Sequence, residues 1–320
     1  MILQQKTEHC TLCPRQCGVN RMQGERGICG ETDQIRVARA SLHMWEEPCI
    51  SGEKGSGTVF FSGCTLHCIF CQNAQIEHGR VGKTVSESEL VDVFLRLQEK
   101  GANNINLVTP GHFADKLVTT IELAKKRGLI VPIVYNTSAY ETVETIRMFD
   151  GLVDIYLPDL KYTDAKLSEN YSHAADYFPV AKKAIAEMVR QTKKPLFQRT
   201  STGEKMDAKE YNAHCDEEEM FMLRGTIVRH LLLPGQTADS KRVLSYLFKT
   251  YGDDIFVSIM NQYTPMEAVK NIPPLNRKVT EKEYEEVVDY AISLGIENAF
   301  IQEGDTATES FIPDFSLQGL

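Results

Sequence analysis

The sequence reads Ser62-Gly63-Cys64-Thr65-Leu66-His67-Cys68-Ile69-Phe70-Cys71-Gln72-Asn73 directly after a hydrophobic run. Its three cysteines have the spacing CxxxCxxC. Three closely spaced thiolates can bind three irons of a [4Fe–4S] cube and leave the fourth iron open to another ligand. Gly63 lets the backbone turn sharply out of the preceding strand, which we expect at 58–61. The segment therefore predicts an iron–sulfur loop at the end of a buried strand.

A structural zinc site is the alternative interpretation of Cys64, Cys68 and Cys71. Zinc sites usually combine such thiols with a second CxxC pair or with a histidine pair at matching distance. Neither lies within reach of this loop in the sequence. The spacing therefore favours the cluster over zinc.

The composition limits the classes of protein to which the chain can belong. Its 320 residues include 35 Lys and Arg against 44 Asp and Glu, a net charge of -9 that argues against a general nucleic-acid binder. No apolar run approaches transmembrane length, and the N-terminus reaches polar residues too early for a secretory signal. We therefore expect a cytoplasmic protein that does not bind membranes. In a reducing cytosol, cysteines gathered in two tight clusters are predicted to bind metal instead of forming disulfides.

Strand-like and helix-like segments alternate along the chain, which is typical of βα units and a parallel sheet. The first helix has a capping box of Ser86 and Glu89. Six strands with crossover helices predict an α/β fold, a partial (β/α)6 parallel barrel with a small N-terminal metal-bound cysteine module. The expected strands are 58–61, 104–108, 131–135, 153–157, 226–233 and 255–260, and the expected helices are 86–100, 114–127, 141–149 and 238–251.

We expect three parts in the chain. Residues 1–55 form the cysteine-rich module and a linker, residues 56–270 form the barrel, and residues 271–320 form a C-terminal extension that packs on it. In the extension, Thr280 and Glu283 form a second capping box, and 299–302 is strand-like. A strand there would cover the open edge of the sheet, which is otherwise a site of unwanted pairing.

Polar residues and turn formers follow the expected strands at their carboxyl ends. Catalytic residues of barrel folds lie at this end, so these positions predict a pocket. The alternative is that such residues only cap the next helix, as Asn136 and Ser138 can. The candidate pocket residues are Thr109, Gly111, Asn136, Ser138, Asp159, Lys161 and Asn261.

The cysteine loop, with the aromatic Phe70 just before its third cysteine, resembles the signature of the radical S-adenosylmethionine (SAM) superfamily. The resemblance implies that Cys64, Cys68 and Cys71 bind a [4Fe–4S] cluster that cleaves SAM reductively to a 5′-deoxyadenosyl radical, which abstracts hydrogen from a substrate. It places Phe70 next to the adenine. It makes Asn136, Ser138 and Asn261 candidates for contact with the ribose or the substrate.

Two further segments are similar to those of pyruvate formate-lyase activating enzymes. These are Asp159-Leu160-Lys161 and the run 229–235 with the sequence Arg-His-Leu-Leu-Leu-Pro-Gly. The likeness implies that Lys161, with Asp159 beside it, contacts the SAM carboxylate. The second strand departs from the superfamily pattern because Thr-Pro-Gly-His stands where a Gly-Gly-Glu turn often holds the SAM amino group. Backbone carbonyls at Thr109 or Gly111 can supply that contact instead.

A second constellation precedes the barrel and contains Cys10, Cys13, Cys17 and Cys29. Four thiols form a closed ligand set that suits structural zinc or an auxiliary iron–sulfur cluster. A small loop-rich module without a hydrophobic core needs a bound metal ion to stabilise its fold, which favours zinc. The alternative is that the module binds a cluster that relays electrons to the cluster of the barrel.

With this module the chain resembles a subgroup described as pyruvate formate-lyase activating enzyme-like, also named as the radical SAM member of a system with AMMECR1-type and Memo-type partners. The resemblance implies an electron donor such as flavodoxin or ferredoxin. Three functions remain: an activase that makes a glycyl radical on a partner enzyme, a radical SAM enzyme that modifies a small molecule or another protein residue, and a non-catalytic metal-stabilised adaptor. The intact CxxxCxxC and Lys161 argue against the adaptor.

Overall fold

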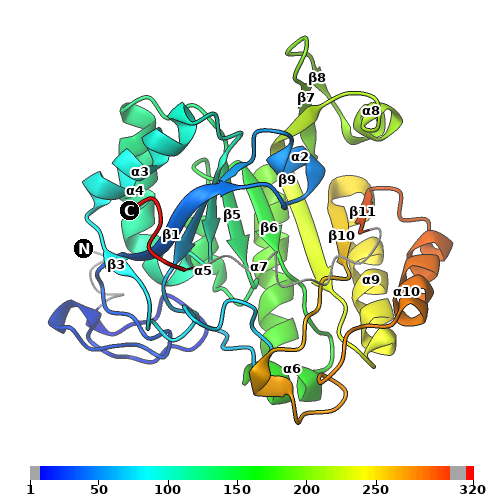
Figure 1. The fold of residues 1–320 in the computed structure, drawn as a ribbon, viewed down its shortest axis with the longest axis horizontal. Coiled ribbons are helices and arrows are strands. Elements are labelled where there is room, and N and C mark those ends of the chain that lie inside the picture. Colours follow the sequence, from blue (N-terminus) through cyan, green and yellow to red (C-terminus); the bar gives the residue numbers. More distant parts are fainter. Residues whose placement is uncertain (1–7, 303–314) are drawn as a thin grey trace.

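The computed structural model describes residues 8–302 and 315–320, which form a mainly parallel sheet with helices packed around it (Figure 1). The strands lie side by side in the order β11-β10-β9-β6-β5-β4-β2-β1-β3. Their bounds are β1 Arg36–His43, β2 Ser56–Phe61, β3 Lys83–Thr84, β4 Ile105–Val108, β5 Ile133–Thr137, β6 Ile155–Pro158, β9 Met220–Leu231, β10 Phe256–Met260 and β11 Ala299–Ile301.

The pairs from β2 through β4, β5, β6, β9 and β10 to β11 are all parallel. Every residue of β2, β4, β5, β6 and β10 is buried. Parallel strands are covered on both faces, and they therefore appear in the sequence as short apolar runs instead of alternating patterns. The predicted partial (β/α)6 barrel is confirmed, with β1 and β3 at one edge and β11 at the other.

The crossover helices begin where the sequence predicted. Ser86 and Glu89 form the capping box of α3, and Thr280 and Glu283 form that of α10. The helices are α2 Pro48–Ser51, α3 Glu87–Glu99, α4 Ala114–Lys126, α5 Val143–Arg147, α6 Ala165–Ser172, α7 Tyr177–Thr192, α8 Ala208–His214, α9 Thr237–Tyr251 and α10 Glu281–Leu294, with short 3-10 turns η1 Arg21–Gln23, η2 Gly111–Phe113, η3 Gly252–Asp254 and η4 Glu267–Val269.

The C-terminal part of the chain packs on the sheet at two places. Helix α10 lies against α9, and β11 pairs with β10 at the edge of the sheet. The hydroxyl of Tyr284 donates to the carbonyl of Ile259 at 2.8 Å and accepts from the amide of Gln302 at 2.9 Å. Residues 315–320 lie on β1, where the amide of Ala40 donates to the carbonyl of Gln318 at 2.9 Å.

Two strand features were not predicted from the sequence. Strand β1 pairs antiparallel with β2, so a segment expected to be a linker joins the sheet. Strands β7 Leu196–Arg199 and β8 Lys205–Met206 form a hairpin on the first half of β9, and with α8 they make the arm at the top of Figure 1. Such short strands give little periodicity in the sequence, and they are held by pairing with the long strand β9.

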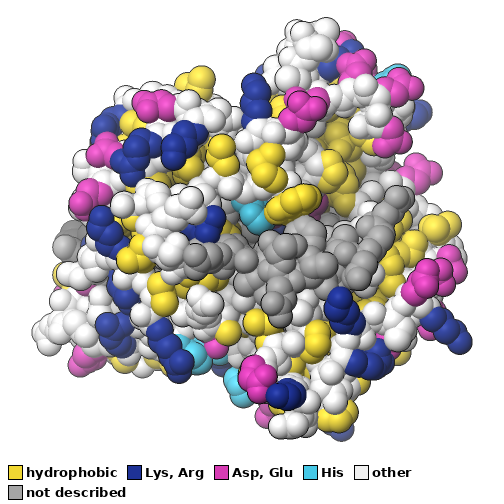
Figure 2. Space-filling view, viewed as in Figure 1, with side chains coloured by type: hydrophobic (Ala, Val, Ile, Leu, Met, Phe, Trp, Pro, Cys, Tyr) yellow, Lys and Arg dark blue, Asp and Glu magenta, His cyan; other side chains and the backbone are white. Residues whose placement is uncertain are grey.

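Charged side chains of both signs are spread over the face of the molecule drawn in Figure 2. In the described ranges, every helix is too short or too polar to cross a membrane.

Candidate functional site

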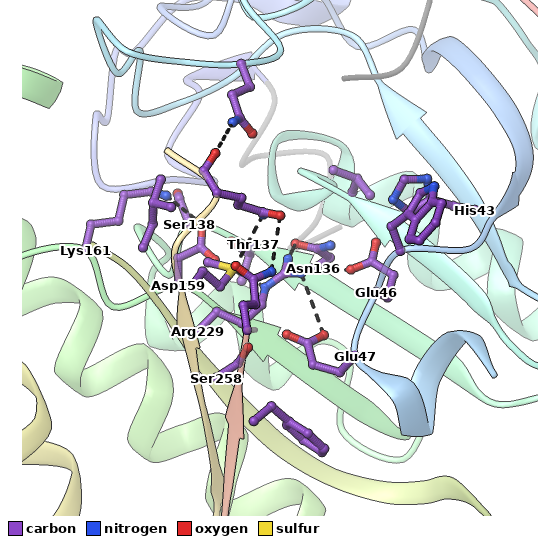
Figure 3. Close-up of a pocket in the computed structure, with 18 of the residues that line it drawn as sticks. His43, Glu46, Glu47, Asn136, Thr137, Ser138, Asp159, Lys161, Arg229 and Ser258 are labelled. Atoms are coloured by element: carbon purple, nitrogen blue, oxygen red, sulfur yellow. Dashed lines mark hydrogen bonds and ion pairs between the residues drawn. The ribbon is translucent and has the colours of Figure 1, made fainter. Parts of the chain in front are cut away.

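A cavity of about 610 Å³ opens at the carboxyl ends of the parallel strands (Figure 3). Its wall combines the three-cysteine loop, residues at the ends of β4, β5 and β6, residues of β9, β10 and β11, and the segment 43–48 between β1 and α2. The loops after successive parallel strands converge at this edge, which is where active sites of such folds lie. The cavity is therefore the candidate functional site.

Most of the residues predicted from the sequence line this cavity. The set is Cys64, Cys68, Phe70, Cys71, Thr109, Asn136, Ser138, Asp159 and Lys161. Gly111 and Asn261 are not among the lining residues. Gly111 is covered by the Glu141 carboxylate, and a Cβ built on it would lie 2.3 Å from both carboxylate oxygens. The amide of Asn261 donates to the side chain of Gln302 at 2.7 Å, and its neighbours Met260 and Gln262 face the cavity instead.

The cysteine loop leaves β2 through Gly63, whose φ of 84° lies in the left-handed region. Two sulfurs of the loop accept hydrogen bonds from protein groups. The amide of Leu66 donates to Cys64 Sγ at 3.4 Å, and the hydroxyl of Ser172 donates to Cys68 Sγ at 3.0 Å. Donors aimed at sulfur are the outer contacts that orient and tune iron–sulfur ligands.

The loop thiols are protonated when no metal holds them. Burial raises the pKa of Cys68 to about 11 and the pKa values of Cys64 and Cys71 above their ordinary range. The ammonium of Lys161 opposes this rise at Cys64 and Cys68. Thiolates in this loop therefore need positive charge from bound metal, and three thiols with hydrogen-bond donors to sulfur and a nearby cation fit a [4Fe–4S] cluster.

Lys161 forms a buried ion pair beside the cysteines. Its Nζ lies 2.6 Å from Asp159 Oδ2, and both side chains are mostly buried. Burial lowers the pKa of Lys161, but the Asp159 carboxylate and the neighbouring cysteines outweigh it and hold the pKa above its usual value. Lys161 therefore stays charged, and its ammonium can contact a ligand carboxylate in the cavity.

Arg229 on β9 is the centre of a second charge network (Figure 3). Its guanidinium lies 2.8 Å from Glu46 and 3.4 Å from Asp159, and it donates to Asn136 at 2.5 Å. The same guanidinium lies 3.9 Å from Glu47. Burial raises the pKa of Glu47, and Arg229 opposes the rise. The network fixes the ends of β5, β6 and β9 against the segment before α2.

Glu46, Glu47 and Arg229 were not among the predicted site residues. Glu46 and Glu47 stand in the irregular segment Trp-Glu-Glu-Pro, which carries no periodicity that would place it over the barrel. Adjacent acidic residues in a cysteine-rich linker are ordinarily solvated. Glu47 is nevertheless buried, with 7% of its surface exposed. This burial is decided by the pairing of β1 with β2, which leads the segment over the strand ends.

The N-terminal module packs against the cysteine loop. Its Cys10, Cys13 and Cys29 are buried, and Cys17 is half-buried. Burial raises the pKa of Cys13 to about 12 and that of Cys29 to about 11, so these thiols also need metal in order to ionise. The structure thus brings the four predicted ligands into one module beside the barrel site.

Side chains tie the module to the loop at several points. Arg15 donates to the carbonyls of Thr65 at 2.8 Å and Leu66 at 3.1 Å. His67 Nε2 bonds to the carbonyl of Ile28 at 2.8 Å and, because a carbonyl only accepts, this nitrogen carries the proton. The module therefore holds the backbone of the cysteine loop on both sides of Leu66.

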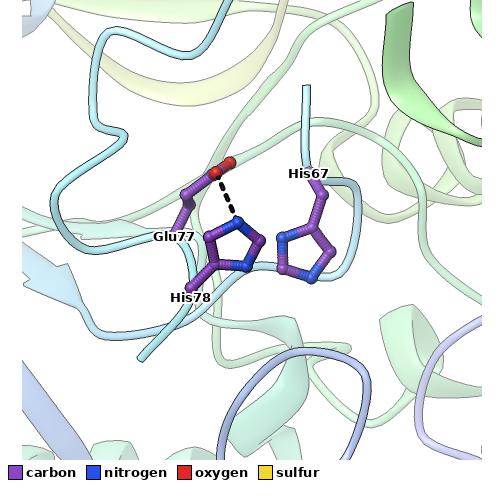
Figure 4. A group of neighbouring side chains, drawn as sticks. All are labelled: His67, Glu77 and His78. Atoms are coloured by element: carbon purple, nitrogen blue, oxygen red, sulfur yellow. Dashed lines mark ion pairs between the residues drawn. The ribbon is translucent and has the colours of Figure 1, made fainter. Parts of the chain in front are cut away.

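His67 also belongs to a small cluster with Glu77 and His78 (Figure 4). The two imidazole rings stack with centroids 4.6 Å apart, and His78 Nε2 lies 3.1 Å from Glu77 Oε1. The cluster has ligand atoms within 4.8 Å of one another, a distance at which one metal ion can be shared. It lies on the outer side of the loop, where His67 contacts the module.

Comparisons with known proteins found one superfamily profile, one curated relative and several solved structures. The sequence profile of the radical SAM superfamily matches residues 58–197. The uncharacterized protein MJ0674 of Methanocaldococcus jannaschii is 27% identical over 296 residues, which cover 89% of this chain and 74% of that protein.

Solved structures with a similar fold include SuiB of Streptococcus suis bound to its precursor peptide SuiA, with 12% identity and a TM-score of 0.47. HydG of Carboxydothermus hydrogenoformans, a maturase of the FeFe-hydrogenase, has 13% identity and a TM-score of 0.49. A domain of the pyruvate-formate lyase-activating enzyme of Bacteroides vulgatus has 12% identity and a TM-score of 0.36. The SuiB match covers 76% of this chain and 47% of that chain, and the HydG match covers 80% and 56%. The match to the activating-enzyme domain covers 59% of this chain and 91% of that domain. The chain thus spans about half the length of the SuiB and HydG structures.

The profile match begins in β2, includes the whole cysteine loop and continues to the start of β7. It covers Asp159 and Lys161 as well as the three loop cysteines. The likeness to the radical SAM superfamily is therefore carried by residues 58–197 of this chain.

Proposed function

We propose that this protein is an enzyme that cleaves SAM reductively in the 610 Å³ cavity and uses the resulting radical to abstract hydrogen from a substrate. The observation that carries the proposal is that Cys64, Cys68 and Cys71 line one cavity together with Lys161 and Asp159. A [4Fe–4S] cluster with one open iron, and SAM bound to it, would supply a 5′-deoxyadenosyl radical and methionine.

The residues of the chain have separate roles in this proposal. The three cysteines hold the cluster, and the Lys161 ammonium contacts the SAM carboxylate while Asp159 holds the ammonium in place at 2.6 Å. Phe70 is packed at 5% exposure near Tyr263, with ring centroids 6.1 Å apart, and offers an aromatic wall for the adenine. Thr109, Asn136 and Ser138 present polar groups for the SAM amino group, the ribose or the substrate.

The experiment is anaerobic reconstitution with iron and sulfide, followed by reduction and measurement of 5′-deoxyadenosine and methionine after SAM is added. We expect both products in equal amounts, and their loss in Cys64→Ala, Cys68→Ala and Cys71→Ala. Cys49→Ala is the matched control, because Cys49 is not among the residues that line the cavity and belongs to neither cysteine group. Product formation by any of the three loop variants would refute the proposal.

For the substrate we propose a segment of a partner protein, as in an activase that makes a glycyl radical. Trp45 and Ile301 line the cavity with 63% and 43% of their surface exposed, and Met44 beside them is 42% exposed. Large apolar side chains gathered at a cavity rim are typical of surfaces that dock another protein. Candidate partners are glycyl-radical enzymes and AMMECR1-type or Memo-type proteins, with flavodoxin or ferredoxin as the electron donor.

A glycyl radical on the partner gives a doublet in the electron paramagnetic resonance spectrum. We expect this signal only when the partner, SAM and the reduced protein are combined, and we expect Trp45→Ala to weaken it without changing the cleavage of SAM alone. A small-molecule substrate would be indicated instead if every partner is inert and a metabolite extract accelerates SAM cleavage.

A further inference from the structure

The four thiols of the N-terminal module are not gathered at the spacing of a zinc tetrahedron. Thiolates at about 2.3 Å from zinc in a tetrahedron lie about 3.8 Å from one another. Within residues 8–302 and 315–320, no three of the sulfurs of Cys10, Cys13, Cys17 and Cys29 come within 4.8 Å of one another. The spacing in this module therefore exceeds that of a zinc tetrahedron.

Two of the four sulfurs lie on either side of one glycine. A Cβ built on Gly27 would lie 3.3 Å from Cys17 Sγ and 3.4 Å from Cys29 Sγ, so these two sulfurs flank the same glycine. Cys13 interacts electrostatically with both Cys29 and Cys10. Thiolates at the corners of a four-iron cube lie farther apart than thiolates around a single ion, because the cube itself separates them. The wide spacing of the thiols in this module is of the kind that a cluster site requires.

The barrel loop provides an internal comparison. Cys64, Cys68 and Cys71 also fail to come within 4.8 Å of one another as a group of three, although they line the cavity side by side. The two cysteine sets thus share the same wide spacing, and the second of them carries the superfamily's cluster signature.

A buried cation next to the module requires a buried anion. Arg21 is 1% exposed, and its guanidinium donates to the carbonyl oxygens of Thr32 and, at 2.5 Å, His112. It also donates a hydrogen bond to the side chain of Cys10. Within the part of the chain that the structure describes, Arg21 forms no ion pair with a carboxylate, and Asp115 interacts with it only at longer range, whereas Cys10 is a direct hydrogen-bond partner. An uncompensated buried charge is costly, and a cluster with four thiolates carries the negative charge that would balance Arg21.

The module is connected to the barrel loop through its ligands. The amide of Cys64 donates to the carbonyl of Cys29 at 3.2 Å, so one hydrogen bond joins a cysteine of each set. Arg21 donates to the carbonyl of His112, and His112 Nε2 in turn bonds to the carbonyl of Ser62 at 2.7 Å. The two sites therefore share a continuous buried network of polar groups.

We propose that Cys10, Cys13, Cys17 and Cys29 hold a second [4Fe–4S] cluster, and that this cluster passes single electrons to the cluster of the barrel loop. In each transfer the module cluster is oxidised from the 1+ to the 2+ state and the barrel cluster is reduced from 2+ to 1+. A low-potential one-electron carrier protein of the flavodoxin or ferredoxin class reduces the module again. The cluster assignment stands without the proposed function, whereas its role as electron donor rests on it.

The first experiment separates the two sites. The triple variant C64A/C68A/C71A removes the barrel ligands and leaves the module intact. After anaerobic purification and reconstitution, we expect about four iron and four sulfide per chain with no stoichiometric zinc, and the Mössbauer spectrum of a [4Fe–4S] cluster. One zinc per chain and no iron would overturn the proposal, even if the wild-type protein cleaves SAM.

The second experiment tests the charge of Arg21 in the same triple background. Arg21→Met removes a positive charge from beside the cluster, so we expect the midpoint potential of the module cluster to fall, while Arg21→Lys keeps it close to that of the parent. An unchanged potential in Arg21→Met would contradict the pairing of Arg21 with a cluster. If Arg21→Met does not fold, the metal content of its parent still decides the assignment.

The third experiment tests electron transfer in the protein with an intact barrel loop. In C10A/C13A we expect the barrel cluster to keep its spectrum and to support SAM cleavage with dithionite, but to be reduced at least tenfold more slowly by reduced flavodoxin. Equal reduction rates in the variant and the wild type would overturn the relay. Absence of SAM cleavage in the wild type would refute the proposed function and leave the iron content of the triple variant as a separate result.

Discussion

The backbone amide of Cys64 donates a hydrogen bond to the carbonyl oxygen of Cys29 at 3.2 Å. Cys29 is the last cysteine of the N-terminal module, and Cys64 is the first of the barrel loop. The hydrogen bond forms where the chain turns out of β2, so the module is attached directly to the segment that would hold the cluster. The two cysteine groups are thus parts of one structural unit.

Gly63 makes this contact possible, and we expect Gly63→Ala to break it. A Cβ on Gly63 would lie 2.5 Å from the carbonyl oxygen of Cys29, and φ of 84° disfavours any side chain. Because the clash is with backbone, we expect a loss of about 1–3 kcal/mol in unfolding free energy and a lower iron content. Gly101→Ala is the control, since Gly101 has a φ of 88° with nothing within 4 Å. Equal effects of the two substitutions would show that only backbone strain matters.

Lys161→Met tests the proposed contact with SAM. The substitution keeps the length of the side chain and removes its charge, so we expect the Kd for SAM to rise at least tenfold, equivalent to about 1.4 kcal/mol or more. Binding is measured on the reconstituted, oxidised protein, and the iron content is expected to stay at the wild-type level. Lys270→Met, at an exposed position, is expected to bind SAM normally. Wild-type affinity in Lys161→Met would exclude this lysine as the carboxylate anchor.

Arg229→Met tests the buried charge network. Without the guanidinium, Glu46 loses its cation at 2.8 Å and Glu47 loses the one at 3.9 Å, while Asp159 keeps only Lys161. We expect a loss of about 3–5 kcal/mol in unfolding free energy, measured by urea denaturation. Arg127→Gln breaks an exposed ion pair of 2.7 Å with Asp92 and should change little. A small effect of Arg229→Met would mean that the carboxylates are protonated in the folded protein.

The pH dependence of stability tests Glu141. Burial raises the pKa of Glu141 to about 7 from an ordinary value of 4.5, although hydrogen bonds from Thr137 and Tyr135 oppose the shift. The unfolded chain releases this proton near its ordinary pKa while the folded protein keeps it up to about 7. The folded state therefore loses stability as the pH rises from 4.5 to 7, by up to about 3 kcal/mol.

We expect Glu141→Gln to reduce that loss, measured as the difference in unfolding free energy between pH 5.5 and pH 8. Glu122→Gln, on the exposed face of α4, removes the same charge and should keep the wild-type slope. If Glu141→Gln also has the wild-type slope, other groups cause the pH dependence.

Local signals in the sequence were sufficient for the elements of the barrel. The capping boxes at Ser86 and Thr280 need only residues three positions apart, and both are present in the structure. Short apolar runs gave the parallel strands, because a strand covered on both faces must be apolar throughout. The cysteine loop and the Asp159–Lys161 pair were also visible, since their members are neighbours in the chain.

The remaining features depend on contacts between distant segments, and no local pattern encodes them. Glu46 meets Arg229 only because β1 pairs with β2 and carries the segment before α2 over the strand ends. The β7–β8 hairpin exists because β9 extends beyond the sheet and offers it a partner.

By itself, the sequence determined the alternation of strands and helices and the positions of the two cysteine groups, because residue type, spacing and hydrophobic period are local properties. Only the tertiary structure decided that Cys29 touches Cys64, that Arg21 is buried, and that Gly111 is covered by Glu141 instead of facing the cavity. These are consequences of packing, in which segments far apart in the chain compete for the same buried space.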